Sequence, residues 1–153
     1  MVTLRPYRAE DQETVVVLWW RSWHSIRHGL RHPLQFADFG TRWASEIVPR
    51  QTIVVAEDDG VVVGFAAADL SAHELTQIFV QPDRKRHGVG GQLLAWARQM
   101  MPEGFCLWTL EDNVASRAFY ERHGLAAGGT RVNPVNAMST IEYRWTPLPG
   151  GHP

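Results

Sequence analysis

The segment from residue 78 to residue 94 constrains the fold most strongly, because it reads as a strand, a tight turn and a helix in direct succession. Apolar residues end at Val80, and an amphipathic stretch runs from Gly88 to Met101. A helix that begins in glycines leaves its first N–H groups open to an anion. The turn also carries hydrogen-bonding side chains, namely Arg84, Lys85, Arg86 and His87. We expect this turn to bind a diphosphate.

The rest of the chain alternates strand-like runs with helical runs, which is typical of an α/β or α+β domain. Seven strands are expected, at 3–8, 51–57, 61–70, 74–80, 105–110, 125–132 and 138–145. Four helices are expected, at 15–26, 39–48, 88–101 and 114–123. Asp11 stands where it could cap the first helix. The length of 153 residues suits one domain, over 1–146, with a loose tail at 147–153.

Composition excludes several classes of protein. Fifteen Lys and Arg residues balance 16 Asp and Glu residues, which argues against a general nucleic-acid binder. The single cysteine, Cys106, cannot form an internal disulfide or a cysteine-based zinc site. The most apolar stretch, 61–68, is too short to span a bilayer, and residues 1–6 lack the apolar core of a signal peptide. We therefore expect a cytoplasmic protein without a membrane partner.

Three histidines at spacings of four residues, His24, His28 and His32, could suggest a metal-binding stripe. Gly29 interrupts the helix on which such a stripe would lie, and no carboxylate nearby completes a ligand set. No metal is expected.

A second motif follows the glycine turn by about twenty residues and covers 113–125. Asn113, Ser116 and Tyr120 are spaced i, i+3 and i+7, so they share one face of a helix. Capping explains Asn113 and Gly124, but it gives no reason for Ser116 and Tyr120 to share that face. This pattern indicates a functional face.

The glycine turn is neither a P-loop nor a Gly-x-Gly-x-x-Gly turn, which would need a glycine at Leu93. Residues 85–90 resemble instead the Arg/Gln-x-x-Gly-x-Gly/Ala turn of the GNAT superfamily of acyl-CoA-dependent N-acyltransferases, with Lys85 in place of Arg or Gln. Residues 113–125 are similar to that family's Asn-x-x-Ala/Ser-x-x-Phe-Tyr-x-x-x-Gly-Phe segment, with Leu125 for the last Phe. Both motifs occur in the family's order.

The resemblance implies a mixed, strongly bent sheet of about seven strands with four helices, splayed between the fourth and fifth strands. Acetyl-CoA is then the expected co-substrate, with its pantetheine arm and pyrophosphate in that gap. The residues expected to hold it are Phe79, Val80, Lys85, Arg86, His87, Gly88, Val89, Gly90, Gly91, Asn113, Ser116 and Phe119.

The resemblance also implies the catalytic groups. Tyr120 is expected to protonate the leaving thiolate, and Glu74 to deprotonate the amine, because both positions match family residues with these roles. A water relay, or His73 or Asp69, could replace Glu74 as the base.

The family binds its acceptor near the first two helices and the late loops, so we expect acceptor contacts from Trp20, Trp23, His24 and Trp108. Trp19 and Trp23 also fit a normal buried helix face with Val15 and Val16.

The function expected from the resemblance is direct transfer of an acetyl group to a primary amine of a small molecule or peptide. Three alternatives stay open: acetylation of a protein lysine or N-terminus, a non-catalytic acyl-CoA-binding module, and acetylation of aminoacyl-tRNA. The balanced charge makes the last one less attractive. The family often forms homodimers, although no interface is indicated in this sequence.

Overall fold

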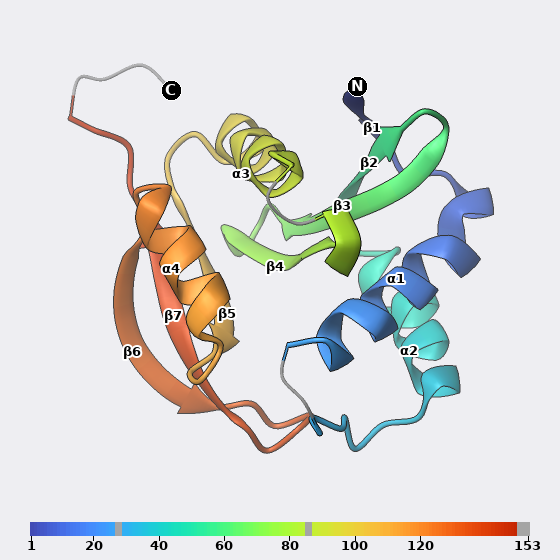
Figure 1. The fold of residues 1–153 in the computed structure, drawn as a ribbon. Coiled ribbons are helices and arrows are strands. Elements are labelled where there is room, and N and C mark those ends of the chain that lie inside the picture. The colour runs from blue at the N-terminus through green and yellow to red at the C-terminus, as the bar shows by residue number, and fades with distance from the viewer. Residues whose placement is uncertain (27–28, 85–86, 150–153) are drawn as a thin grey trace.

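The computed structural model describes residues 1–26, 29–84 and 87–149, and its centre is a single sheet of seven strands (Figure 1). The spatial order is β1-β2-β3-β4-β5-β7-β6. The strands are β1 (Val2–Pro6), β2 (Thr52–Asp58), β3 (Val61–Asp69), β4 (Glu74–Val80), β5 (Phe105–Leu110), β6 (Ala126–Val132) and β7 (Ser139–Trp145). The expected mixed sheet is confirmed. Of the expected loose tail, residues 150–153 lie outside the described part of the chain.

Four α-helices accompany the sheet, as expected. They are α1 (Gln12–His24), α2 (Phe36–Arg42), α3 (Val89–Met100) and α4 (Val114–Arg122). Three shorter helical turns are η1 (Ala9–Asp11), η2 (Trp43–Ile47) and η3 (Pro82–Arg84).

The second helix was expected over 39–48 but begins earlier, at Phe36. The carboxylate of Asp38 accepts a hydrogen bond from the backbone N–H of Gln35 at 2.8 Å, which fixes the start of α2. After Arg42 the helix widens into the π-helical turn η2.

Asp11 occupies the N-cap position of α1, as expected, but its side chain makes no capping hydrogen bond to that helix. Its carboxylate accepts two hydrogen bonds from the guanidinium of Arg5, at 2.8 and 2.9 Å, and one from the backbone N–H of Arg8 at 2.8 Å. The Arg5 guanidinium is the main cause of a lowered Asp11 pKa. Asp11 therefore ties β1 to the turn that precedes α1, because a bidentate arginine is a stronger partner than one N–H group.

The two faces of the sheet carry separate apolar cores. One core packs α3 and α4 against the sheet and contains, among others, Val63, Leu75, Leu93, Leu107 and Tyr143. The other packs α1 and α2 against β2 and β3 and contains Trp19, Phe39, Trp43, Val55 and Phe65. Burial of these side chains is the main force that holds each helix on its face. The buried positions of Trp19 and Trp23 confirm the expected core face of α1.

The strands β4 and β5 form the one parallel pair of the sheet and share a single registered position, Glu74 with Cys106. Beyond that point the two strands separate, and Figure 1 shows the gap between the β1–β4 half and the β5–β7–β6 half. The expected splay is thus confirmed. A small cluster of Trp23, Leu30 and Leu110 joins the end of α1 to the end of β5 across the gap. No described helix is long and apolar enough to cross a membrane.

Candidate active site

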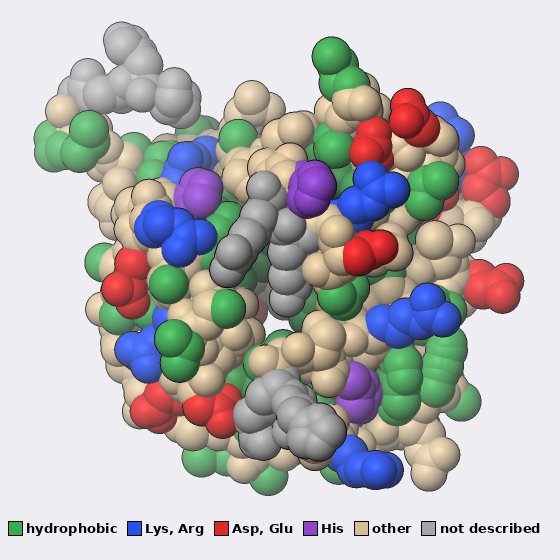
Figure 2. Space-filling model, in the orientation of Figure 1, with side chains coloured by type: hydrophobic (Ala, Val, Ile, Leu, Met, Phe, Trp, Pro, Cys, Tyr) green, Lys and Arg blue, Asp and Glu red, His purple; other side chains and the backbone are tan. Residues whose placement is uncertain are grey.

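A cavity of about 650 Å³ lies in the gap between β4 and β5. Its walls come from α1, α2, β4, the first turn of α3, β5, α4 and the connection between β6 and β7. In Figure 2 the surface is hollowed between these two halves of the molecule. The cavity has a cofactor end, which we define by residues 88–91 and 113–123, and an acceptor end, which we define by α1, α2, His32 in the loop between them, β5 and residues 133–140.

The glycine turn forms one wall of the cofactor end. Gly88 has a φ of +81°, the left-handed conformation that glycine adopts most readily, and it stands at the N-cap of α3 without a side-chain hydrogen bond. The first helical bond of the turn runs from Gln92 N–H to the Gly88 carbonyl at 3.1 Å. The N–H groups of residues 89–91 have no acceptor among the described residues and can bind an anion.

Several predicted cofactor residues surround this turn. Gly88, Gly90 and Gly91 line the cavity, whereas the side chain of Val89 is buried in the core, so only its backbone can serve a ligand. His87 is exposed next to the turn. Lys85 and Arg86 lie outside the described residues.

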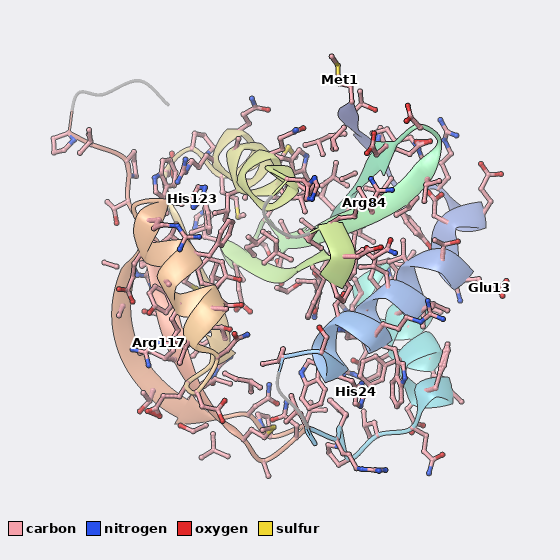
Figure 3. The ribbon with its side chains drawn as sticks, viewed as in Figure 1. Met1, Glu13, His24, Arg84, Arg117 and His123 are labelled. Carbon is pink, nitrogen blue, oxygen red and sulfur yellow. The ribbon has the colours of Figure 1, made fainter. Side chains whose placement is uncertain are left out.

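The helix α4 forms the opposite wall. Asn113 caps it, since its Oδ1 accepts a hydrogen bond from Ser116 N–H at 3.2 Å, and its Nδ2 group remains as a donor. Asn113, Ser116 and Tyr120 all line the cavity, as expected for one helix face. Phe119 also lines it, and Figure 3 places His123 at the end of α4 that lies next to α3.

Tyr120 is the most buried titratable group in the cavity wall, with 6% of its surface exposed. Its hydroxyl makes no hydrogen bond with any described residue, although its ring lies 5.6 Å from that of Tyr143. Burial raises the pKa of Tyr120, so the phenol stays neutral at pH 7 and keeps its proton available. The Tyr120 phenol can therefore donate a hydrogen bond into the cavity at pH 7.

Glu74 lies half-buried at the start of β4, beside Cys106. Burial raises its pKa, and the charge of Arg131 opposes that shift. Glu74 does not line the cavity, and neither do the alternative bases His73 and Asp69.

Two of the four predicted acceptor residues, Trp23 and Trp108, line the cavity. Trp20 and His24 do not, because the Trp20 ring packs on His24 at 4.1 Å between centroids and faces the second helix. The guanidinium of Arg131 covers one face of Trp108 at 3.8 Å from the ring centroid. Trp108 therefore presents only part of its ring to a ligand.

Sequence reasoning missed other residues of the acceptor end, namely Trp19, Ser22, His32, Phe39, Arg42, Asn133 and Asn136. Trp19 and Phe39 are core residues with at most 3% of their surface exposed, so they form the buried backing of the cavity wall. The asparagines belong to the β6–β7 connection, which no sequence pattern places near α2.

The cavity offers no metal site within the described ranges, where no group of three or more His, Cys, Asp and Glu residues could hold an ion. His32 and His24 both belong to hydrogen bonds with the backbone, and His28 lies outside the described residues.

Comparisons with known proteins agree with this geometry. The family model described as the acetyltransferase (GNAT) family matches residues 13–125. A protein of Mycobacterium tuberculosis named as a probable N-acetyltransferase is 24% identical over 97% of the chain and 87% of its own length. A peptidyl-lysine N-acetyltransferase of Salmonella typhimurium is 26% identical over 84% of the chain and 86% of its own length.

The fold is also found among solved structures. The PaiA N-acetyltransferase from Thermoplasma acidophilum, solved in complex with coenzyme A, superimposes with a TM-score of 0.73 at 18% identity. That match covers 95% of the chain and 99% of the solved one.

Proposed function

The chain belongs to the GNAT acetyltransferase family and is an acyltransferase, and from this premise we propose that it transfers an acetyl group from acetyl-CoA directly to a primary amine. The observation that carries this proposal is the position of Tyr120: its side chain is buried in the cavity wall, and its hydroxyl has no hydrogen-bond partner among the described residues. A small-molecule amine is the proposed acceptor.

The cofactor end suits acetyl-CoA, because the PaiA N-acetyltransferase, a neighbour in fold, was solved in complex with coenzyme A. The N–H groups of residues 89–91, which have no acceptor among the described residues, would hold the pyrophosphate, and we propose that Lys85, Arg86 and His87 assist them. The backbone of Phe79 and Val80 would pair with the pantetheine arm, since β4 has no partner strand on that side beyond Glu74. Asn113 Nδ2 and Ser116 supply further donors.

Acetyl-CoA supplies a thioester whose leaving group is a thiolate. Tyr120 would donate its phenolic proton to that thiolate, because a neutral phenol that has no competing acceptor is free to do so. Phe119 and Leu75 would keep bulk water away from the reacting groups.

The acceptor amine must lose a proton before it attacks. No Asp or Glu lines the described cavity, so we place the first proton transfer on water. Glu74, with its raised pKa, stays a candidate for the far end of such a relay. Direct abstraction of the proton by Glu74 is the alternative, and a large loss of activity in Glu74→Gln would reveal it.

A peptide lysine is the second candidate acceptor, because a relative of the chain is named for that activity. A non-catalytic acyl-CoA-binding module is disfavoured, since such a module has no use for the placed hydroxyl of Tyr120.

The first test is the thermal stability of the full chain with acetyl-CoA, with NAD and ATP as controls. A ligand at 100 times its Kd stabilises by about 2.7 kcal/mol, which shifts Tm by several degrees. Stabilisation by acetyl-CoA alone, followed by CoA release with an amine panel, supports the proposal. No stabilisation at saturation contradicts the assignment of acetyl-CoA.

A further inference from the structure

The acceptor end of the cavity has an unusual charge balance for a site that must receive an amine. No Asp or Glu is found among the described lining residues, whereas Arg42 contributes a permanent positive charge. An ammonium group is attracted by carboxylates and repelled by a guanidinium. The positive charge of the acceptor end therefore indicates that the acceptor carries a negatively charged group in addition to its amine.

Arg42 is the last residue of α2 and is held with its guanidinium next to the ring of Trp19, at 5.5 Å from the centroid. Its Nε donates to Glu46 Oε2 at 3.2 Å, and 24% of its side chain is exposed. Glu46 lies 59% exposed outside the cavity, where solvent weakens the pair. Both terminal nitrogens of Arg42 have no acceptor among the described residues, which leaves the two-pronged donor that matches a carboxylate.

His32 adds a second donor to the same wall. Its Nδ1 accepts a hydrogen bond from Leu34 N–H at 3.0 Å, so in the neutral ring the proton sits on Nε2. Burial, followed by the charge of Arg42, lowers the pKa of His32 to about 4, so the ring is neutral at pH 7. The ring is held between Trp23 and Phe39, at centroid distances of 4.6 and 4.8 Å.

The β6–β7 connection contributes donors as well. Asn133 Oδ1 accepts from Val135 N–H at 2.8 Å, and Asn136 Oδ1 accepts from Met138 N–H at 3.0 Å. Each amide oxygen is thus engaged by the backbone, and the Nδ2 group of each asparagine remains. Arg42, His32 and the two asparagines thus supply N–H donors to the acceptor end, which Trp23 and Trp108 also line.

We propose that the acceptor is an amine that also carries a carboxylate and an apolar body, such as an aromatic or aliphatic amino acid, and that Arg42 binds its carboxylate. The assignment rests on the proposed acetyl transfer at the same cavity. The partly exposed side chains of Ile26 and Phe79, together with Trp23, line the cavity and take up the apolar body. A polyamine or a lysine-rich peptide would place further cations against Arg42, and it would leave the N–H donors without acceptors.

The experiment compares three amines that share one ring: L-phenylalanine, L-phenylalaninamide and phenethylamine. CoA release is measured with the full chain, with Arg42→Gln, and with Arg21→Gln as a matched control, because Arg21 is exposed on α1 outside the cavity. We expect L-phenylalanine to exceed both carboxylate-free amines in kcat/KM by about tenfold or more. Arg42→Gln should abolish that preference through KM, and Arg21→Gln should keep it.

The same assays are repeated with leucine and isopentylamine, a pair with an aliphatic body that differs in the carboxylate. A lysine-containing peptide is added to test a peptide acceptor. Acetylation of the carboxylate-free amines or the peptide in preference to every amino acid overturns the assignment, and so does a preference that survives Arg42→Gln. Failure of acetyl-CoA itself to bind overturns the acetyl-transfer proposal instead, so the two failures are distinguishable.

Discussion

A Cβ added at Gly90 would lie 2.8 Å from Cζ of Phe119, because the first turn of α3 and the helix α4 are in direct contact there. A real Cβ atom is almost never found at that distance from another heavy atom. Gly90 thus sets how closely the ring of Phe119 approaches the turn, and with it the width of the cofactor end.

Gly90→Ala should weaken acetyl-CoA binding by about tenfold, because the ring of Phe119 must turn toward the cavity. Isothermal titration with acetyl-CoA measures this change. Gly40→Ala is the matched control, since a Cβ there meets no heavy atom within 4 Å and the residue lies outside the cavity. Equal affinities for the Gly90 variant and the original protein would contradict a role of this contact in shaping the site.

Tyr120→Phe should lower kcat by about 10²- to 10⁴-fold and leave the KM for acetyl-CoA nearly unchanged, because the phenol acts on the leaving thiolate. The hydroxyl has no described hydrogen-bond partner, so the free energy of unfolding should not fall. Steady-state CoA release and chemical denaturation measure the two effects. A destabilised variant, or one of normal kcat, would show that the tyrosine is a packing residue.

Glu74→Gln should keep kcat/KM within about tenfold of the original value, because Glu74 does not line the cavity. For the same reason the plot of kcat/KM against pH should keep its acidic limb. The folded-state pKa of Glu74 is raised by burial, so its ionisation costs stability as pH rises through that pKa. The variant should therefore be as stable as the original protein at pH 4 and more stable at pH 7. Loss of the acidic limb together with a large loss of activity would restore Glu74 as the direct base.

His32→Asn should flatten the pH dependence of stability. The pKa of His32 is lowered from 6.5 to about 4 in the fold, so the unfolded chain binds the proton more tightly over that range. The free energy of unfolding of the original protein should fall as pH decreases from 6.5 toward 4. Asparagine can still accept from Leu34 N–H, so denaturation at several pH values should give a smaller slope for the variant. Parallel curves would contradict the pKa shift.

Local sequence patterns were sufficient for much of this protein. Alternating apolar runs identified all seven strands, and the glycines at 88, 90 and 91 with the 113–125 segment indicated the cofactor end. These features are local because strand periodicity, a left-handed glycine and a helix cap each depend on a few neighbouring residues.

Local sequence patterns could not predict the residue at which α2 begins or the residue that binds the Asp11 carboxylate. Asp11 was available both to cap α1 and to bind Arg5, and only the position of β1 beside the turn favours the arginine. A choice between two partners depends on which one the fold brings near.

The acceptor end was decided by the tertiary structure alone. Arg42, His32 and Asn136 come from three segments without a shared pattern, and they line one cavity because β4 and β5 separate and the β6–β7 connection forms part of its wall. The same packing turns Trp20 and Glu74 out of the cavity lining, although the sequence placed both near the chemistry. The sequence determined the strands and the cofactor turn because those depend on near neighbours. The acceptor wall depended on long-range packing, which no short pattern encodes.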